Sequence, residues 1–218
     1  MLLEGCELNL IYDVGKEDMV QALKDVSLTA GAGETVGIMG PSGSGKSSLL
    51  YVLSGLREPT SGTVYYKGID MGSYTPDDRT KLRKREFGFI FQRLFLIEYL
   101  TVLENVVVGA NDNSPATTNQ ALDLLDKLGL KSLASKKPSR LSGGQRQRVA
   151  IARALINGPS VIFADEPTAS IDHRNGMEIM RILEDFKDRS AVIVVTHDRA
   201  ILQNADKVIE IWDGLIKK

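Results

Sequence analysis

A segment rich in glycine and serine carries the most specific chemistry in the sequence. Residues 40–47 read Gly-Pro-Ser-Gly-Ser-Gly-Lys-Ser and fit the pattern G-x-x-x-x-G-K-[ST]. Glycines let such a loop turn its N–H groups toward phosphate oxygens, and the following helix presents its positive dipole end. In this setting Lys46 reaches the β- and γ-phosphates, and the Ser47 hydroxyl meets Mg²⁺. The segment predicts a phosphate-binding loop, with a plain glycine-rich turn as the alternative.

Two adjacent acids follow an apolar run. Residues 161–164 have the composition of a buried strand, and Asp165 and Glu166 come directly after it. Because α/β folds bind ligands at the carboxyl ends of their strands, Asp165 is expected near Mg²⁺. Glu166 is expected to polarise the water that attacks the γ-phosphate. Taken alone, the pair could also be a helix cap.

A third motif is Leu-Ser-Gly-Gly-Gln at residues 141–145. It opens a helical pattern that continues to Leu155. A helix N-terminus flanked by glycines and a serine is free to meet a phosphate group. As a lone pattern it could equally be a glycine-containing cap.

Together these motifs resemble those of the ATP-binding cassette ATPases, in which LSGGQ is the signature sequence. The resemblance covers essentially the whole chain. The phosphate loop is followed, in the family's order, by Gln92, the signature, Asp165-Glu166, Asp172 and His197. It implies ATP and Mg²⁺ as cofactors, ATP hydrolysis as the activity, and catalytic roles for Lys46, Glu166 and His197.

The resemblance also implies roles for single positions. Tyr12 matches the aromatic residue that stacks on adenine, with plain strand surface as the alternative. His197 matches the histidine at the γ-phosphate, and Gln92 matches the glutamine that contacts Mg²⁺ or water. Mg²⁺ is expected at Ser47, Gln92 and Asp165. The implied nucleotide contacts are Tyr12, Gly40, Ser42, Gly43, Ser44, Gly45, Lys46, Ser47, Ser48, Gln92, Ser142, Gly143, Gly144, Gln145 and Asp172.

ATPases that the sequence resembles work as dimers. Each ATP would lie between Lys46 and Glu166 of one subunit and Ser142 and Gly144 of a second copy. Neither helix terminus alone encloses the phosphates, so only the closed pair excludes water. Asp172 matches the loop that signals between the subunits. His173 matches no family position and is expected on the surface, and Trp212 is expected to pack inside.

Short apolar runs predict the elements that carry these motifs. Residues 35–39, 87–91, 161–164 and 191–196 read as strands buried on both faces, which is typical of a parallel sheet. The alternation within residues 2–30 favours an antiparallel flap, and residues 94–138 are mostly helical in pattern. The expected fold is α/β, a P-loop NTPase (RecA-like) core with a β flap and a helical signature subdomain. We expect one domain over residues 1–218, with 1–92 and 160–218 as core and flap and 93–159 as the helical subdomain.

Composition limits the partners. The 218 residues include 27 Lys+Arg and 28 Asp+Glu, so there is no overall attraction to nucleic acid. The basic cluster within residues 79–85 is expected to be a solvated helix face. The single cysteine, Cys6, indicates a reducing compartment. With no apolar stretch long enough to span a bilayer, the sequence predicts a cytosolic protein. The resemblance to transporter ATPases implies separate permease subunits that hold it at the cytoplasmic face of the membrane.

The details most resemble the branch that serves MacB-type and lipoprotein-releasing exporters. Within it, residues 164–170 and 196–202 look more like the heme-exporter and heterocyst-glycolipid-exporter ATPases. Ala169-Ser170 stands where macrolide and lipoprotein members usually carry Gly-Asn. Heme or another hydrophobic or amphipathic compound is therefore the expected cargo. The alternatives are a cassette ATPase of a non-transporting membrane complex, such as a cell-division regulator, and a soluble cassette protein.

The segment 92–100 is predicted to dock the permease. Its side chains are largely apolar, although it follows a strand end in a region expected near the surface. Exposed apolar patches usually mark partner sites. The alternative is that these side chains fill the core of the helical insertion.

Overall fold

The computed structural model describes residues 1–13, 15, 18–169, 171 and 173–217. Its strands are β1 (Leu3–Tyr12), β2 (Val20–Ala30), β3 (Thr35–Met39), β4 (Ser61–Tyr66), β5 (Ile69–Asp70), β6 (Phe87–Ile90), β7 (Val161–Asp165), β8 (Ala191–Val195), β9 (Lys207–Trp212) and β10 (Leu215–Ile216). Its α-helices are α1 (Lys46–Leu53), α2 (Pro76–Glu86), α3 (Val102–Val107), α4 (Pro115–Lys127), α5 (Gly143–Leu155) and α6 (His173–Asp185). Short 3₁₀ turns are η1 (Met71–Ser73), η2 (Lys131–Leu133), η3 (Pro138–Arg140), η4 (Lys187–Arg189) and η5 (Arg199–Leu202).

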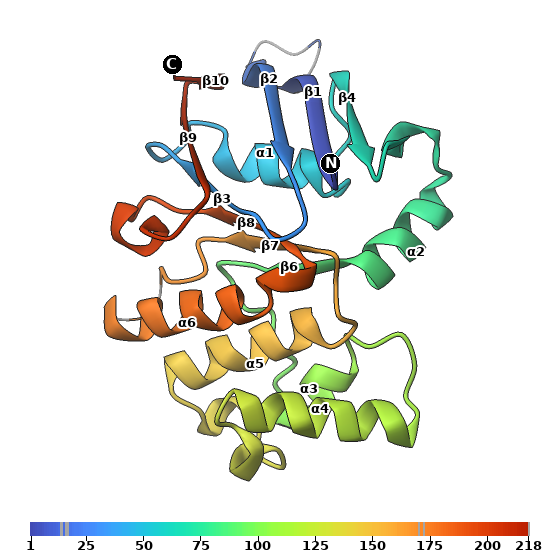
Figure 1. Cartoon of the computed structure of the whole chain (residues 1–218), viewed down its shortest axis with the longest axis vertical. Coiled ribbons are helices and arrows are strands. Elements are labelled where there is room, and N and C mark those ends of the chain that lie inside the picture. Colours follow the sequence, from blue (N-terminus) through green and yellow to red (C-terminus); the bar gives the residue numbers. More distant parts are fainter. Residues whose placement is uncertain (14, 16–17, 170, 172, 218) are drawn as a thin grey trace.

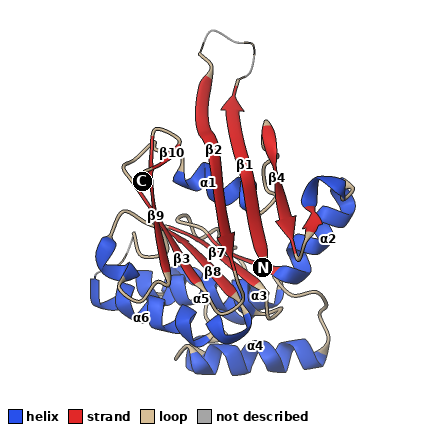
Figure 2. Ribbon diagram, turned by 45° about the horizontal axis from the view of Figure 1, so that its top comes forward, coloured by secondary structure: helices blue, strands red, loops and turns tan. Residues whose placement is uncertain are grey.

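The larger of two sheets has the strand order β10-β9-β3-β8-β7-β6 and is parallel except for β10. The smaller sheet is antiparallel, in the order β2-β1-β4-β5. Helix α1 lies between the two sheets, and α5, α6, α3 and α4 lie on the opposite side of the larger sheet (Figures 1 and 2). The predicted α/β fold with a mostly parallel sheet and an antiparallel flap is confirmed. The structure adds β4 and β5 to the flap, which the alternation in residues 2–30 did not reveal.

Strand β7 shows why the central runs are apolar throughout. Val161 and Phe163 pack into the core shared with α1 and the flap, whereas Ile162 and Ala164 pack into the core shared with the helices below. All four are fully buried. Because successive side chains of a strand point to opposite faces, a strand covered on both sides has no polar position. The expected strands at 35–39, 87–91 and 191–196 are likewise present as β3, β6 and β8.

Helix α4 begins and ends at residues with recognised capping roles. Helix α4 starts after Ser114, whose side chain accepts a hydrogen bond from the N–H of Thr117, and Gly129 follows it with a φ of 70°. The division into a core and a helical subdomain at residues 93–159 stays a prediction. Among the described residues, no helix has the length and apolar character needed to cross a membrane.

One expectation about the C-terminal strand is wrong. Trp212 was expected to pack inside, but it remains 49% exposed at the end of β9. Its ring lies under Lys217, whose Nζ is 4.9 Å from the ring centre. The pairing of β10 against β9 brings this cation over the ring, which the local pattern did not reveal.

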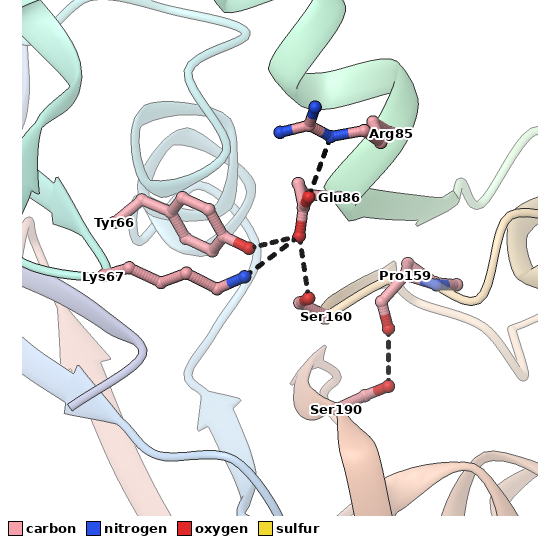
Figure 3. Close-up of polar contacts among 7 residues, drawn as sticks. All are labelled: Tyr66, Lys67, Arg85, Glu86, Pro159, Ser160 and Ser190. Carbon is pink, nitrogen blue, oxygen red and sulfur yellow. Dashed lines mark hydrogen bonds and ion pairs between the residues drawn. The ribbon is translucent and has the colours of Figure 1, made fainter. Parts of the chain in front are cut away.

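A partly buried carboxylate joins the flap to the larger sheet. Glu86, the last residue of α2, accepts hydrogen bonds from the Tyr66 hydroxyl at 2.7 Å and from Ser160 at 2.9 Å. Lys67 and Arg85 add ion pairs at 3.2 and 2.9 Å (Figure 3). Burial opposes the charge of Glu86, but these four contacts outweigh it and lower the pKa of the carboxyl to about 2.

Candidate active site

The phosphate loop connects β3 to α1, and two of its glycines are required by close backbone contacts. A Cβ on Gly40 would lie 2.1 Å from the Ile211 carbonyl oxygen, and one on Gly45 would lie 2.3 Å from that of Ala22. Their φ values of 149° and 103° are also in the region that favours glycine. The loop is therefore pressed against β9 and β2. This close approach leaves its outer side facing the cleft.

The first turn of α1 is arranged for an anion. Its N-cap is Gly45, which provides no side chain to cap the free N–H groups. Lys46 is mostly buried, and its Nζ donates a hydrogen bond to the Pro41 carbonyl oxygen at 2.8 Å, across the loop. Uncapped N–H groups and a fixed cation at one helix end make a favourable phosphate site.

A polar network behind the loop joins α1 to β7. Ser47 Oγ donates to Asp165 Oδ1 at 3.0 Å, and the Tyr51 hydroxyl donates to Asp165 Oδ2 at 3.2 Å. Burial raises the pKa of Asp165, and the nearby Glu166 adds to this effect, while the two hydrogen bonds oppose it. A hydroxyl and a carboxylate held together supply the hard oxygen ligands that Mg²⁺ prefers. These oxygen donors fit Mg²⁺. The Ser47 hydroxyl lines the cleft, and Asp165, which does not line it, accepts the hydrogen bond of that hydroxyl.

Glu166 and His197 face each other at the ends of β7 and β8. His197 Nδ1 lies 3.0 Å from both carboxylate oxygens of Glu166. Glu166 adopts a φ of 48°, and its N–H donates to the Val195 carbonyl oxygen at 2.8 Å. A left-handed conformation in a residue other than glycine is uncommon and concentrates at functional sites.

One cleft of about 1030 Å³ collects most of the predicted groups. Those that line it are Tyr12, Ser42, Gly43, Gly45, Lys46, Ser47, Ser48, Gln92, Glu166 and His197. Gly40, Ser44 and Asp165 do not line it: Ser44 and Asp165 are buried, and Gly40 lies against Ile211. The cleft therefore brings together an aromatic ring, the first turn of α1 with its lysine, and a carboxylate–histidine pair, a set that suits a nucleoside triphosphate with Mg²⁺.

A second group of lining residues was missed by the sequence reasoning. It is formed by residues of β2 and of the turn between β9 and β10, namely Val20, Gln21, Ala22, Lys24, Asp213 and Gly214. The Lys24 N–H donates to the Gly214 carbonyl oxygen at 2.8 Å and joins the two segments. The pairing of β1 with β2 shifts register between Leu23 and Gln21, so simple alternation does not identify these residues, and only the fold shows that they meet the phosphate loop.

The signature opens on a different depression. Ser142 caps α5, its Oγ accepting from the Gln145 N–H at 3.3 Å while its own N–H donates to Gln145 Oε1 at 2.9 Å. The depression is lined by Ser142, Gly143, Gly144 and Gln145 with Arg148, Ile171 and Asn175. None of these residues lines the cleft of the phosphate loop. Within one chain the structure keeps the two motifs apart, and Asp172 lies outside the described residues.

The family of the chain is shown by a sequence comparison. A family model described as ABC transporter matches residues 23–169. The Macrolide export ATP-binding/permease protein MacB of Salmonella choleraesuis (strain SC-B67) is 48% identical over 99% of this chain and 34% of that protein. The protein of the same name from Acinetobacter baylyi (strain ATCC 33305 / BD413 / ADP1) is 49% identical over 99% of this chain and 33% of its own length. The chain spans about a third of these curated relatives.

Solved structures show the same fold. The dimeric, post-hydrolysis structure of the ATP-binding cassette MJ0796 bound to ADP and Pi has a TM-score of 0.91 and 39% identity, covering 100% of this chain and 97% of that chain. A second similar structure, the ADP conformation of the cassette MJ1267, has a TM-score of 0.86 and 26% identity, covering 99% of this chain and 89% of that one. The agreement extends over both sheets and all the helices that carry the cleft and the signature.

Proposed function

The chain belongs to the ABC transporter family, and from this premise we propose that it is the ATP-hydrolysing unit of an exporter that works as an ATP-dependent dimer. Membership confirms the expected cassette ATPase and its fold. The observation that carries the rest is the separation of the phosphate cleft from the signature within one chain. A site that needs both motifs requires a second copy.

Nucleotide binding would use the cleft as it stands. The uncapped N–H groups of α1 and the Lys46 ammonium would hold the β- and γ-phosphates, and Tyr12 would contact the adenine base. Ser47 and Gln92 would hold Mg²⁺, with Asp165 fixing the Ser47 hydroxyl. When bound, Mg²⁺ neutralises phosphate charge and lowers the barrier to phosphoryl transfer.

Hydrolysis would use the pair at the strand ends. Glu166 would accept a proton from the attacking water while the water oxygen bonds to the γ-phosphorus. The bond between the γ-phosphorus and the oxygen that bridges to the β-phosphate would break. His197, with Nδ1 on the Glu166 carboxylate, would orient it and contact the γ-phosphate through the rest of the ring. The side chain of His197 is 69% exposed, so bulk water reaches this pair in a single chain. Closure by a second copy would exclude that water.

The signature would complete the site of the partner copy. The capping box satisfies the N–H of Ser142 and that of Gln145 internally, and the following glycines leave the helix end open to a neighbouring phosphate. Gly144 has open space at its α-carbon, the nearest atoms to an added Cβ being those of Asn175 at 3.8 Å. We propose that residues 93–159 form the helical subdomain that presents this end across the dimer.

The proposed partner is a MacB-type permease, and the proposed place of work is the cytoplasmic face of the membrane. The curated relatives are named as combined ATP-binding and permease proteins, and this chain matches about a third of their length. Heme or another hydrophobic or amphipathic compound remains the proposed cargo. The finer likeness to heme- and heterocyst-glycolipid-exporter ATPases stays a prediction, as does the alternative role in a non-transporting membrane complex.

The docking surface that we propose is residues 92–100. Phe95 and Tyr99 are 57% and 77% exposed, whereas Leu96 packs against the helical core. The loop is hydrogen-bonded to α5, because Arg153 donates to the carbonyl oxygens of Leu94 and Phe95 at 2.5 and 2.7 Å. A fixed loop with outward aromatic rings suits a partner site, and Gln92 connects it to the nucleotide cleft.

The sharpest test of this function is Glu166→Gln. The amide has the shape of the carboxylate but cannot take the proton of water, so hydrolysis should fall by about 100- to 10,000-fold while ATP binding persists. Gel filtration with Mg-ATP should then show a stable dimer. Glu98→Gln, an exposed change outside the cleft, is the control. A variant that stays monomeric and hydrolyses ATP at the wild-type rate would contradict the proposal.

A further inference from the structure

Tyr12 is held from two sides. Its hydroxyl lies 3.1 Å from Ser48 Oγ, in the first turn of α1. The guanidinium carbon of Arg57 lies over its ring, 4.4 Å from the ring centre. The first contact fixes the edge of the ring, and the second fixes its plane.

Arg57 does not belong to the nucleotide cleft, although it contacts a residue that lines it. Among the described residues, those lining the cleft include Tyr12 but not Arg57. Arg57 instead lines a second cavity, of about 260 Å³, together with Glu58 and Arg79, and Tyr12 does not line that cavity. Tyr12 therefore lines the cleft and is also covered on one ring face by the guanidinium group of Arg57.

The backbone at Arg57 is set by the end of α1 and does not depend on the arginine side chain. The N–H groups of Leu56 and Arg57 both donate to the Tyr51 carbonyl oxygen at 3.0 Å. Gly55 turns the chain there with a φ of 64°. Arg57 itself is an exposed residue. Substitutions of its side chain should therefore leave this turn, and the fold, intact.

We propose that Arg57 is a positioning residue for the nucleobase, holding the far face of Tyr12 so that the near face is ready to stack on the base of ATP. The inference rests on the proposed function, because it requires the cleft to bind a nucleotide. A cation over an aromatic face attracts the ring, and a ring that is already oriented loses less freedom when a ligand stacks on it. The stack would run from guanidinium through tyrosine to base, with Ser48 linking it to the phosphate loop.

The test compares a ligand that has a base with one that lacks it. Calorimetry without Mg²⁺ would measure the affinity of the full chain for ATP and for inorganic tripolyphosphate. Arg57→Met keeps the length of the side chain but removes its charge, and should weaken ATP binding about two- to fivefold. Tripolyphosphate binding should be unchanged. Arg57→Lys should recover part of the loss, and Arg181→Met, an exposed change on α6, should have no effect.

A double substitution separates positioning of Tyr12 from a direct contact with ATP. If Arg57 acts through Tyr12, the pair Tyr12→Ala with Arg57→Met should bind ATP no more weakly than Tyr12→Ala alone. Additive losses, or equal losses for ATP and tripolyphosphate, would overturn the proposal. If the wild-type chain binds ATP and Arg57→Met binds it with the same affinity, the proposed role of Arg57 is overturned, whereas the proposed ATPase function is not. If the wild-type chain bound neither ligand, the proposed function itself would fail.

Discussion

The phosphate cleft and the signature site are built in different ways. In the cleft, the hydrogen bond from Ser47 to Asp165 joins residues 118 positions apart, and the Lys24–Gly214 contact joins two distant strands. In the signature, the paired hydrogen bonds of Ser142 and Gln145 join residues three positions apart. The cleft is thus a product of the whole fold, whereas the signature is a local helix cap that is ready to meet another molecule.

This difference predicts how damage should spread. A change in the cleft alters a site that its own chain assembles, so the defect should stay with that chain. A change in the signature should leave its own cleft intact and impair the site of the partner copy.

Lys46→Ala should have the largest effect on binding. It removes the cation that faces the phosphates and the hydrogen bond that spans the loop to Pro41. We expect ATP affinity to fall by about 100-fold, the scale of losing a strong charge-assisted contact in a desolvated site. Calorimetry measures the affinity, and Lys127→Ala on the exposed side of α4 is the control. An unchanged affinity would remove the basis for assigning the phosphate loop.

The signature should act across the dimer. Ser142→Arg places a bulky cation at the cap of α5, and subunits with this change should be inactive alone, as should Lys46→Ala subunits. Mixed, they can form one composite site with both motifs intact. Random pairing gives half mixed dimers with one good site each, so about a quarter of wild-type ATPase activity is expected. Ser132→Arg is the matched control for the charge. No recovery in a mixture that forms mixed dimers would argue against a shared site.

Substitution of Glu86 should lower the stability of the fold without changing nucleotide binding. Its folded-state pKa of about 2 lies below the ordinary 4.5, so its contribution to stability is present above about pH 4.5 and is lost as the pH falls toward 2. Glu86→Gln should lower the free energy of unfolding by about 2 kcal/mol at pH 7. The difference from wild type should shrink at pH 3.

Urea denaturation at both pH values measures this effect, with Glu98→Gln as the exposed control. ATP affinity should not change, because neither Glu86 nor its four partners line the cleft. A pH-independent difference in stability would show that Glu86 acts through packing and not through its charge. A large loss of ATP affinity would show that the contacts of Glu86 between the flap and the larger sheet are coupled to the cleft.

The docking surface should give the smallest effect on the isolated chain. Phe95→Asp and Tyr99→Asp change side chains that are exposed, so folding and ATP binding should persist, while stimulation of ATPase activity by the co-purifying permease should fall several-fold. Val108→Asp changes another exposed apolar residue, at the end of α3, and is the control. If both loop variants unfold, these rings belong to the core. Undiminished stimulation would place the permease contact elsewhere.

The sequence by itself determined the local chemistry. The glycines and Lys46 of the phosphate loop, the helix that the signature opens and the buried runs of β3, β6, β7 and β8 were all predicted, because each depends on neighbours within a few residues. A tight turn needs glycine, a helix start needs a capping oxygen, and a strand covered on both faces needs continuous apolar side chains. These requirements are written into short windows of sequence.

Tertiary structure alone decided which segments meet. The wall of β2 and the β9–β10 turn, the exposure of Trp212, and the position of Arg57 behind Tyr12 depend on pairings between residues far apart in the chain. A single sequence carries little trace of such pairings, because a strand such as β2 has the same alternation whichever partner it faces. The separation of the cleft from the signature has the same origin. The packing of distant strands and helices fixes where each local motif lies, and so decides that the cleft and the signature are apart within one chain.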